Sequence, residues 1–332
     1  MSTDVHATVD ADRPLRLTAR QKFWCVTALK IGLSSLAIVL VVANVDLSSA
    51  WRRAANQNFR LVLLAGGIMA FQIAMGGLRW HCVLRSLRAP VSVRDSLRLF
   101  YISVFFNACL GGVVGGDLVR AWLARRGQVS AGTAVLSVVL DRAAALAGVG
   151  LLVLATAPFF AALVGGSMIV FVPLILAAGG LVGIAATAQL DRLPLRWQRF
   201  WPVRLLHRLG GATREVFLRP ASAALALGLA IVAQTAMAVC AYVLAASLDI
   251  DLSLIDCLLL MQPVALIAAL PISIGGGWGV REAAMVGVLG LVGVPTGAAL
   301  MLSVQLGVLA MIVSLPGGLL WLLDRKAAGA GA

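Results

Sequence analysis

Six long apolar stretches constrain this sequence more than any other feature. They cover residues 24–45, 59–80, 131–157, 166–187, 220–246 and 297–323. An α-helix needs about twenty apolar residues to cross the hydrocarbon core of a bilayer, so each stretch is long enough for one full span. We therefore predict an all-α membrane protein with six full spans.

The composition excludes an ordinary soluble protein. Hydrophobic residues make up 61% of the chain and charged residues 12%, whereas soluble domains have about 45–50% apolar and about 25% charged residues. The longest polar interval covers residues 189–219, which is too short to fold independently in water. We expect no separate catalytic domain beside the membrane part.

Two further apolar regions, 92–130 and 253–294, are interrupted near their middle by glycine clusters. The interruptions read GGVVGGD at 111–117 and PISIGGGWG at 271–279. Each half is shorter than a span, so we predict two re-entrant pairs of half-helices. Irregular backbone at membrane depth is tolerated only where protein covers it or where it lines a wet cavity, so the breaks mark a functional interior. Their glycines are Gly111, Gly112, Gly115, Gly116, Gly275, Gly276, Gly277 and Gly279.

Basic residues gather in the segments that this arrangement places on one side of the membrane. The net charge is +13, and the basic segments are the tail 1–22, the regions 79–98 and 120–126, the segment 192–219 and the tail 325–332. On the other side, Arg52 and Arg53 are the clear exceptions. Because Lys and Arg prefer cytoplasmic loops, we predict a multi-pass protein of a bacterial inner membrane with both termini cytoplasmic.

The two halves of the sequence resemble one another. VSVRDSL at 91–97 matches LSLIDCL at 252–258, and the two glycine breaks follow at similar spacing. The predicted topology gives the matching segments opposite directions, as in the inverted repeats of many secondary transporters. We therefore divide the chain into a first membrane repeat, 23–157, and a second, 158–324.

Six charged residues fall at membrane depth, where an ionised group is costly unless it meets a partner or a cavity. They lie in pairs after the two breaks and inside the third span, and are Asp117, Arg120, Asp141, Arg142, Arg281 and Glu282. One interpretation is structural: internal ion pairs, for instance Asp117 with Arg281 and Asp141 with Arg120, hold the halves in register.

The other interpretation is an anion site. Both glycine breaks end at helix N-termini, where free N–H groups and the helix dipole favour an anion. Arg120, Arg142 and Arg281 would add forked donors suited to phosphate. Asp117, Asp141 and Glu282 would orient those arginines or carry a proton during transport.

The cytoplasmic segment 189–219 contains a further membrane-binding candidate. From Trp197 to Arg219, arginines alternate with large apolar residues. This spacing suits an amphipathic helix lying on an anionic inner leaflet. We predict no metal site, cofactor or nucleic-acid partner. His81 and Cys82, for example, are adjacent and point to different helix faces.

Three motifs carry a resemblance to a known family: GGVVGGDLVR at 111–120, SVVLDR at 137–142 and LPISIGGGWGVRE at 270–282. In this order and spacing, the chain resembles the membrane region of the lysylphosphatidylglycerol synthase family, also called flippase-like integral membrane proteins. The resemblance extends over nearly the whole chain. Well-known members of this family continue into a cytoplasmic aminoacyl-transferase domain, whereas this sequence stops at Ala332. We therefore expect the translocation activity without lipid aminoacylation.

The resemblance and the charges together favour a translocase that moves an anionic or phosphate-bearing lipid between leaflets. The lipid would be a phospholipid or a polyprenyl-linked lipid. Two alternatives stay open at this point: a membrane-embedded lipid headgroup transferase, and a non-transporting partner of a separate lipid synthase.

Overall fold

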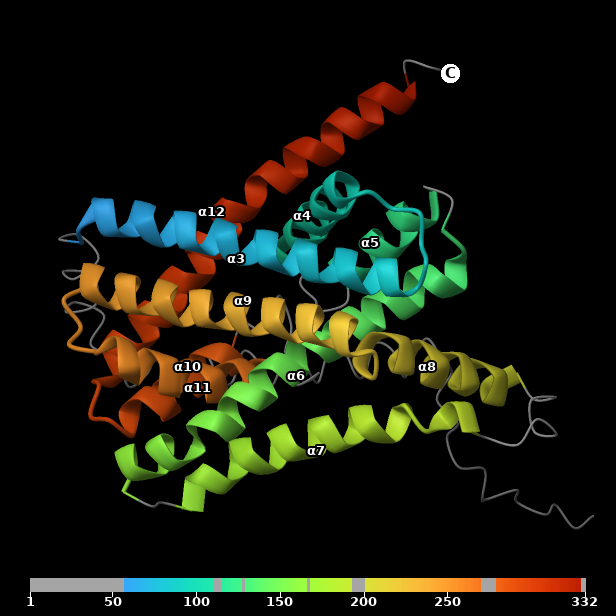
Figure 1. Ribbon diagram of the computed structural model, residues 1–332. Helices are drawn as coiled ribbons and strands as arrows, with labels where there is room; N and C mark the ends of the chain where they lie inside the picture. Colours follow the sequence, from blue (N-terminus) through green and yellow to red (C-terminus); the bar gives the residue numbers. More distant parts are fainter. Residues whose placement is uncertain are drawn as a thin grey trace, which may run out of the picture.

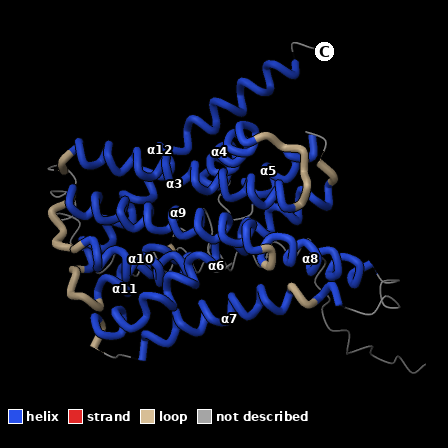
Figure 2. The backbone as a smooth tube through the Cα atoms, in the orientation of Figure 1, coloured by secondary structure: helices blue, strands red, loops and turns tan. Residues whose placement is uncertain are grey.

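The computed structural model describes residues 57–109, 115–126, 129–165, 168–192, 201–269 and 279–329, and within this part the chain is helical without strands (Figure 1, Figure 2). The predicted span 24–45 lies outside the described residues. So do five glycines of the two breaks: Gly111, Gly112, Gly275, Gly276 and Gly277.

Five helices of the described part are long and apolar enough to cross a membrane, so an integral membrane protein with several spans is confirmed. They are α3 (Phe59–Ser86), α6 (Ala131–Leu163), α7 (Phe171–Thr187, continued to Arg192 by the short helix η2, Leu190–Arg192), α9 (Pro220–Ser247) and α12 (Thr296–Gly329). Each coincides with one predicted span. A second short helix, η1 (Met168–Val170), precedes α7.

The starts of these helices follow from local sequence. Asn58 caps α3 by accepting a hydrogen bond from the backbone N–H of Arg60, and Ser130 caps α6 by accepting one from Thr133. Pro220 occupies the first turn of α9, where its missing N–H has no helical partner to lose.

The two regions with glycine breaks each form a pair of short helices. The first pair is α4 (Val93–Cys109) and α5 (Gly115–Arg126), and the second is α10 (Leu254–Ala268) and α11 (Val280–Gly290). The longest has 17 residues and, at about 1.5 Å per residue, is shorter than the roughly 30 Å hydrocarbon core. The repeated Ser-x-x-Asp motif caps both α4 and α10: Ser92 accepts from Asp95 N–H at 3.1 Å, and Ser253 from Asp256 N–H at 3.0 Å.

The helices fall into two sets with the same order, α3–α6 and α9–α12. The first helices of the two sets, α3 and α9, both have 28 residues and lie side by side in opposite directions (Figure 1). The sets also interlock, because α4 packs against α12 while α10 packs against α6. Helices α7 and α8 (Trp201–Phe217) connect the two sets.

The predicted amphipathic segment 197–219 contains helix α8. Its Ala212 and Val216 are buried, whereas Leu205 and Leu206 are exposed. Exposed leucines, isoleucines and phenylalanines also line the spans α3, α7 and α12. Such outward apolar surfaces are typical of helices whose solvent is lipid.

Small residues allow the sets to approach closely, as is usual for helices packed in membranes. The main core consists mostly of residues from α9–α12 and the loops between them, together with Ala65 and Met69 of α3, Phe160 of α6 and Val170 of η1. Where α12 crosses α4, a Cβ added at Gly317 would lie 2.3 Å from the Tyr101 carbonyl oxygen. The Tyr101 hydroxyl donates to the Val313 carbonyl across the same contact, at 2.8 Å. Glycine at 317 is therefore required by backbone packing.

We expect Gly317→Ala to destabilise the protein by about 1–3 kcal/mol, because its methyl group would force α12 away from α4. The measurement is the melting temperature of the detergent-solubilised protein. Gly228→Ala is the matched control, since a Cβ at Gly228 of α9 meets nothing within 4 Å and alanine favours a helix by about 1 kcal/mol. Equal melting temperatures for the two variants would contradict the observed contact between α4 and α12.

Candidate functional site

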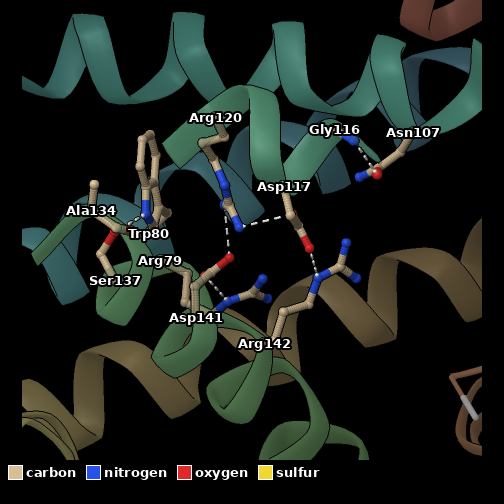
Figure 3. Close-up of polar contacts among 10 residues, drawn as sticks. All are labelled: Arg79, Trp80, Asn107, Gly116, Asp117, Arg120, Ala134, Ser137, Asp141 and Arg142. Carbon is tan, nitrogen blue, oxygen red and sulfur yellow. Dashed lines mark hydrogen bonds and ion pairs between the residues drawn. The ribbon is translucent and has the colours of Figure 1, made fainter. Parts of the chain in front are cut away.

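A network of five charged side chains lies inside the first helix set (Figure 3). Helix α3 contributes Arg79, the first turns of α5 contribute Asp117 and Arg120, and α6 contributes Asp141 and Arg142. The sequence predicted four of these five residues as candidates.

The five residues form one continuous chain of ion pairs. Asp141 accepts from Arg79 Nε at 2.8 Å and from Arg120 Nη1 at 2.9 Å. Asp117 accepts from Arg120 Nη2 at 3.1 Å and from Arg142 Nε at 2.7 Å. The order along the chain is therefore Arg79, Asp141, Arg120, Asp117, Arg142.

The pairing confirms one suggested ion pair and corrects the other. Arg120 does bind Asp141. Asp117, suggested as a partner of Arg281, instead binds the two arginines of its own helix set. Because Asp117 lies one turn before Arg120 on α5, the nearer arginine reaches it without crossing to the second set.

Arg79 is the member of the network that the sequence does not predict. It lies at the edge of the apolar run 59–80, among the basic residues expected on the cytoplasmic side, but α3 continues to Ser86 and buries it. The sequence does contain a signal for such a partner. Asp141 and Arg142 lie within an otherwise apolar stretch, where a buried carboxylate requires compensation by cations.

Arg120 is the most enclosed member of the network. Its side chain is 1% exposed, and its guanidinium lies 4.7 Å from the ring centre of Trp80 and 5.0 Å from that of Phe100. Trp80 is fixed in turn by donating from Nε1 to Ser137 Oγ at 3.2 Å. Two carboxylates and two aromatic faces thus hold Arg120, which makes it a structural support for its neighbours.

Arg142 is placed differently. Its side chain is 44% exposed and lines a cavity of about 420 Å³ enclosed by α3, α4, α5, α6 and α9. The bond from its Nε to Asp117 fixes the direction of the guanidinium while leaving the side chain accessible. All five charged residues line this cavity, together with neutral polar side chains that include Gln72, Ser103, Asn107 and Gln234.

The first glycine break begins α5 at a tight contact with α4. Gly116 donates its N–H to Asn107 Oδ1 at 2.9 Å (Figure 3), and a Cβ at this position would lie 1.9 Å from the Ser103 carbonyl oxygen. The Gly116 N–H, predicted as a donor to an anion, is therefore already engaged by the protein. Gly115 is the first residue of α5.

The second break leads into a separate polar cluster. Glu282 accepts hydrogen bonds from the Gly279 N–H, from Arg281 Nη2 at 2.6 Å and from Ser303 Oγ at 3.2 Å. Gly279 adopts φ 87°, a left-handed conformation that favours glycine. Glu282 therefore caps the start of α11 and ties it to α12.

The two acids occupy equivalent places, because Asp117 and Glu282 are both the third residue of the second half-helix in their set. Each carboxylate also joins its half-helix to other side chains. Arg281 and Glu282 thus bond to each other and to Ser303 of α12, whereas Asp117 bonds to Arg120 and Arg142. Within the described residues, no group of three His, Cys, Asp or Glu side chains could hold a metal ion.

We expect Asp141→Asn to abolish most folded protein, because it leaves Arg79 and Arg120 buried without their shared counter-charge. Breaking a buried ion pair costs about 3–5 kcal/mol. The measurement is the amount of monodisperse protein after detergent extraction, with Asp251→Asn in an exposed loop as the control. Wild-type amounts of Asp141→Asn would show that the network does not support the fold.

Comparison with known families agrees with these features. The family model described as Lysylphosphatidylglycerol synthase TM region matches residues 27–318. A comparison with curated proteins found no significant match. The family match includes both regions with glycine breaks, the ion-pair network, four spanning helices of the described part and most of the fifth, α12. The chain therefore belongs to the lysylphosphatidylglycerol synthase transmembrane-region family.

Proposed function

We propose that this protein translocates a lipid with a phosphate-bearing or otherwise anionic headgroup between the leaflets of a bacterial inner membrane. The observation that carries the proposal is the charged cavity of about 420 Å³ among apolar helices. Arginines and aspartates line this cavity, which the packing of the apolar helices leaves open. The cavity gives a polar headgroup polar surroundings within the membrane after the headgroup has left water.

The charge of the cavity favours an anion. Three arginines and two aspartates line it, which leaves one positive charge in excess. Arg142 is the best placed to meet a ligand, because it is the most exposed of the five charged residues. Its planar guanidinium suits a phosphate, and its bond to Asp117 orients it in advance.

The remaining arginines then have supporting roles. Arg79 and Arg120 are held by Asp141 and add positive potential to the cavity wall. The neutral side chains of Gln72, Ser103 and Gln234 lie along the same wall and can bond to hydroxyl or ester oxygens of a headgroup. The headgroup-binding role predicted for Arg281 is less favoured by its contacts, since Arg281 bonds to Glu282 and Ser303.

The arrangement of the helices favours transport over a static binding site. We interpret the two sets as inverted repeats with re-entrant half-helices, because α3 and α9 match in length and run in opposite directions. Such repeats can expose a central site to each side of the membrane in turn. We place both termini in the cytoplasm from the distribution of basic residues, and α8 on the anionic inner leaflet.

We expect Arg142→Gln to fold normally and to lower lipid translocation about tenfold or more, because a charge-assisted bond contributes about 1.5–3 kcal/mol. The measurement uses vesicles with purified protein and fluorescent phosphatidylglycerol, whose outer-leaflet fraction is quenched chemically. Arg125→Gln is the matched control, since this arginine is exposed on α5 and does not line the cavity. Undiminished translocation by well-folded Arg142→Gln would remove Arg142 from the site.

The same vesicles distinguish the alternative activities. A translocase leaves the mass of the labelled lipid unchanged, whereas a headgroup transferase produces a lipid of altered mass. A partner protein without transport activity moves no lipid in this assay. Mass spectrometry of the recovered lipid and the quenching curve together decide among the three.

We expect Arg281→Ala to reduce the amount of folded protein but to leave translocation per folded molecule near the wild-type value. Glu282 is buried and loses its charged partner in this variant. Extraction yield and vesicle transport should be measured on the same preparations. A full yield with lost transport would instead support the headgroup-binding role that the sequence predicted.

A further inference from the structure

A second hollow, of about 360 Å³, lies where the C-terminal end of α3 meets the junction between α8 and α9. It shares no lining residue with the charged cavity. Its lining residues are His81, Cys82, Arg85, Ser86, Glu215, Arg219, Ala221, Ser222 and Leu225. The proposed translocation does not use any of them.

The polar part of this hollow carries an excess of positive charge. Arg85, in the last turn of α3, is exposed, and within the described part of the chain no ion pair includes it. Arg219 pairs with Glu215 at 2.7 Å. The two arginines and one glutamate thus leave one positive charge, which a phosphodiester would balance.

The rest of the hollow is apolar. Ala221 and Leu225 of α9 line it, and the exposed Leu218 lies in the chain between α8 and α9, next to the lining residue Arg219. On α8, Leu205 and Leu206 are exposed as well. A ligand that fits must therefore have an anionic end and an apolar end, and a free phosphate would use only the first.

We infer that this hollow binds an anionic phospholipid of the leaflet next to the loop between α3 and α4, separately from the translocation cavity. Arg85 holds the phosphodiester and Arg219 adds a second cation, while an acyl chain lies along Leu225 and Leu218. A zwitterionic phospholipid is a poorer ligand, because its ammonium group would face the same arginines.

Cys82 gives this site a direct reporter, because it lines the hollow. In a protein whose other cysteines (25, 109, 240 and 257) are replaced by alanine, we expect dioctanoyl phosphatidylglycerol to slow alkylation of Cys82 in detergent. Dioctanoyl phosphatidylcholine and glycerol 3-phosphate should protect far less at equal concentration. Native mass spectrometry of the wild-type protein, counting bound phosphatidylglycerol, gives a second readout without relying on the reactivity of the thiol.

Two variants test the assignment of the contacts. Arg85→Gln should weaken binding of phosphatidylglycerol about tenfold by both readouts, as expected for loss of one charge-assisted contact. Leu225→Trp should weaken it without any change of charge, because the larger side chain fills the apolar part of the hollow. Arg125→Gln, which removes an exposed charge of α5, should leave binding unchanged.

The outcomes separate this site from the translocation cavity and from general attraction to basic surfaces. Arg142→Gln should leave protection of Cys82 intact, whether or not it impairs translocation. Equal protection by phosphatidylcholine, protection by glycerol 3-phosphate alone, or equal weakening by Arg85→Gln and Arg125→Gln would each overturn the inference. Native mass spectrometry would overturn it too, if the wild-type protein carried no bound phosphatidylglycerol or if Arg85→Gln carried as much as the wild type.

Discussion

The shared carboxylate of Asp141 is the interaction on which the first helix set depends. It lies in the interior of α6 and is 2% exposed, so its charge must be balanced locally. Arg79 from α3 and Arg120 from α5 supply that balance. One buried acid therefore ties three helices together, and it does so at the wall of the cavity. The position of Arg142, the next residue on α6, follows from the same contacts.

The two helix sets share their order of elements but differ in chemistry. Both begin with a helix of 28 residues and both place an acid at the third position of the second half-helix. The first set extends this acid into a network of five charges around a cavity. The second set uses its acid to cap α11 and to bond Ser303. The first set thus provides the charged residues of the cavity wall, and the second provides most of the apolar core.

Five of the six predicted spans, the two interrupted regions and four of the five charges of the network could be predicted from the sequence. Bilayer thickness and the cost of buried charge act on single segments. Arg79 could not be predicted, since its burial depends on α3 extending to Ser86 beyond the apolar run. The partner of Asp117 was also beyond reach, because the choice between Arg120, Arg142 and Arg281 depends on how half-helices pack. The bond from the Gly116 N–H to Asn107 was beyond reach for a similar reason, because sequence spacing does not reveal it.

The distribution of ion pairs also limits how the cavity can open. Moving α3, α5 and α6 apart would separate the paired charges of the network, at a cost of several kcal/mol. The ion pairs of the network all lie among these three helices. Helix α9 nevertheless contributes Ala233 and Gln234 to the cavity wall. A shift of α9 against the first set would therefore widen the cavity while every ion pair of the network stays intact. Where α9 packs against α6, Ala230 meets Gly148, so a movement along this contact separates none of the paired charges of the network.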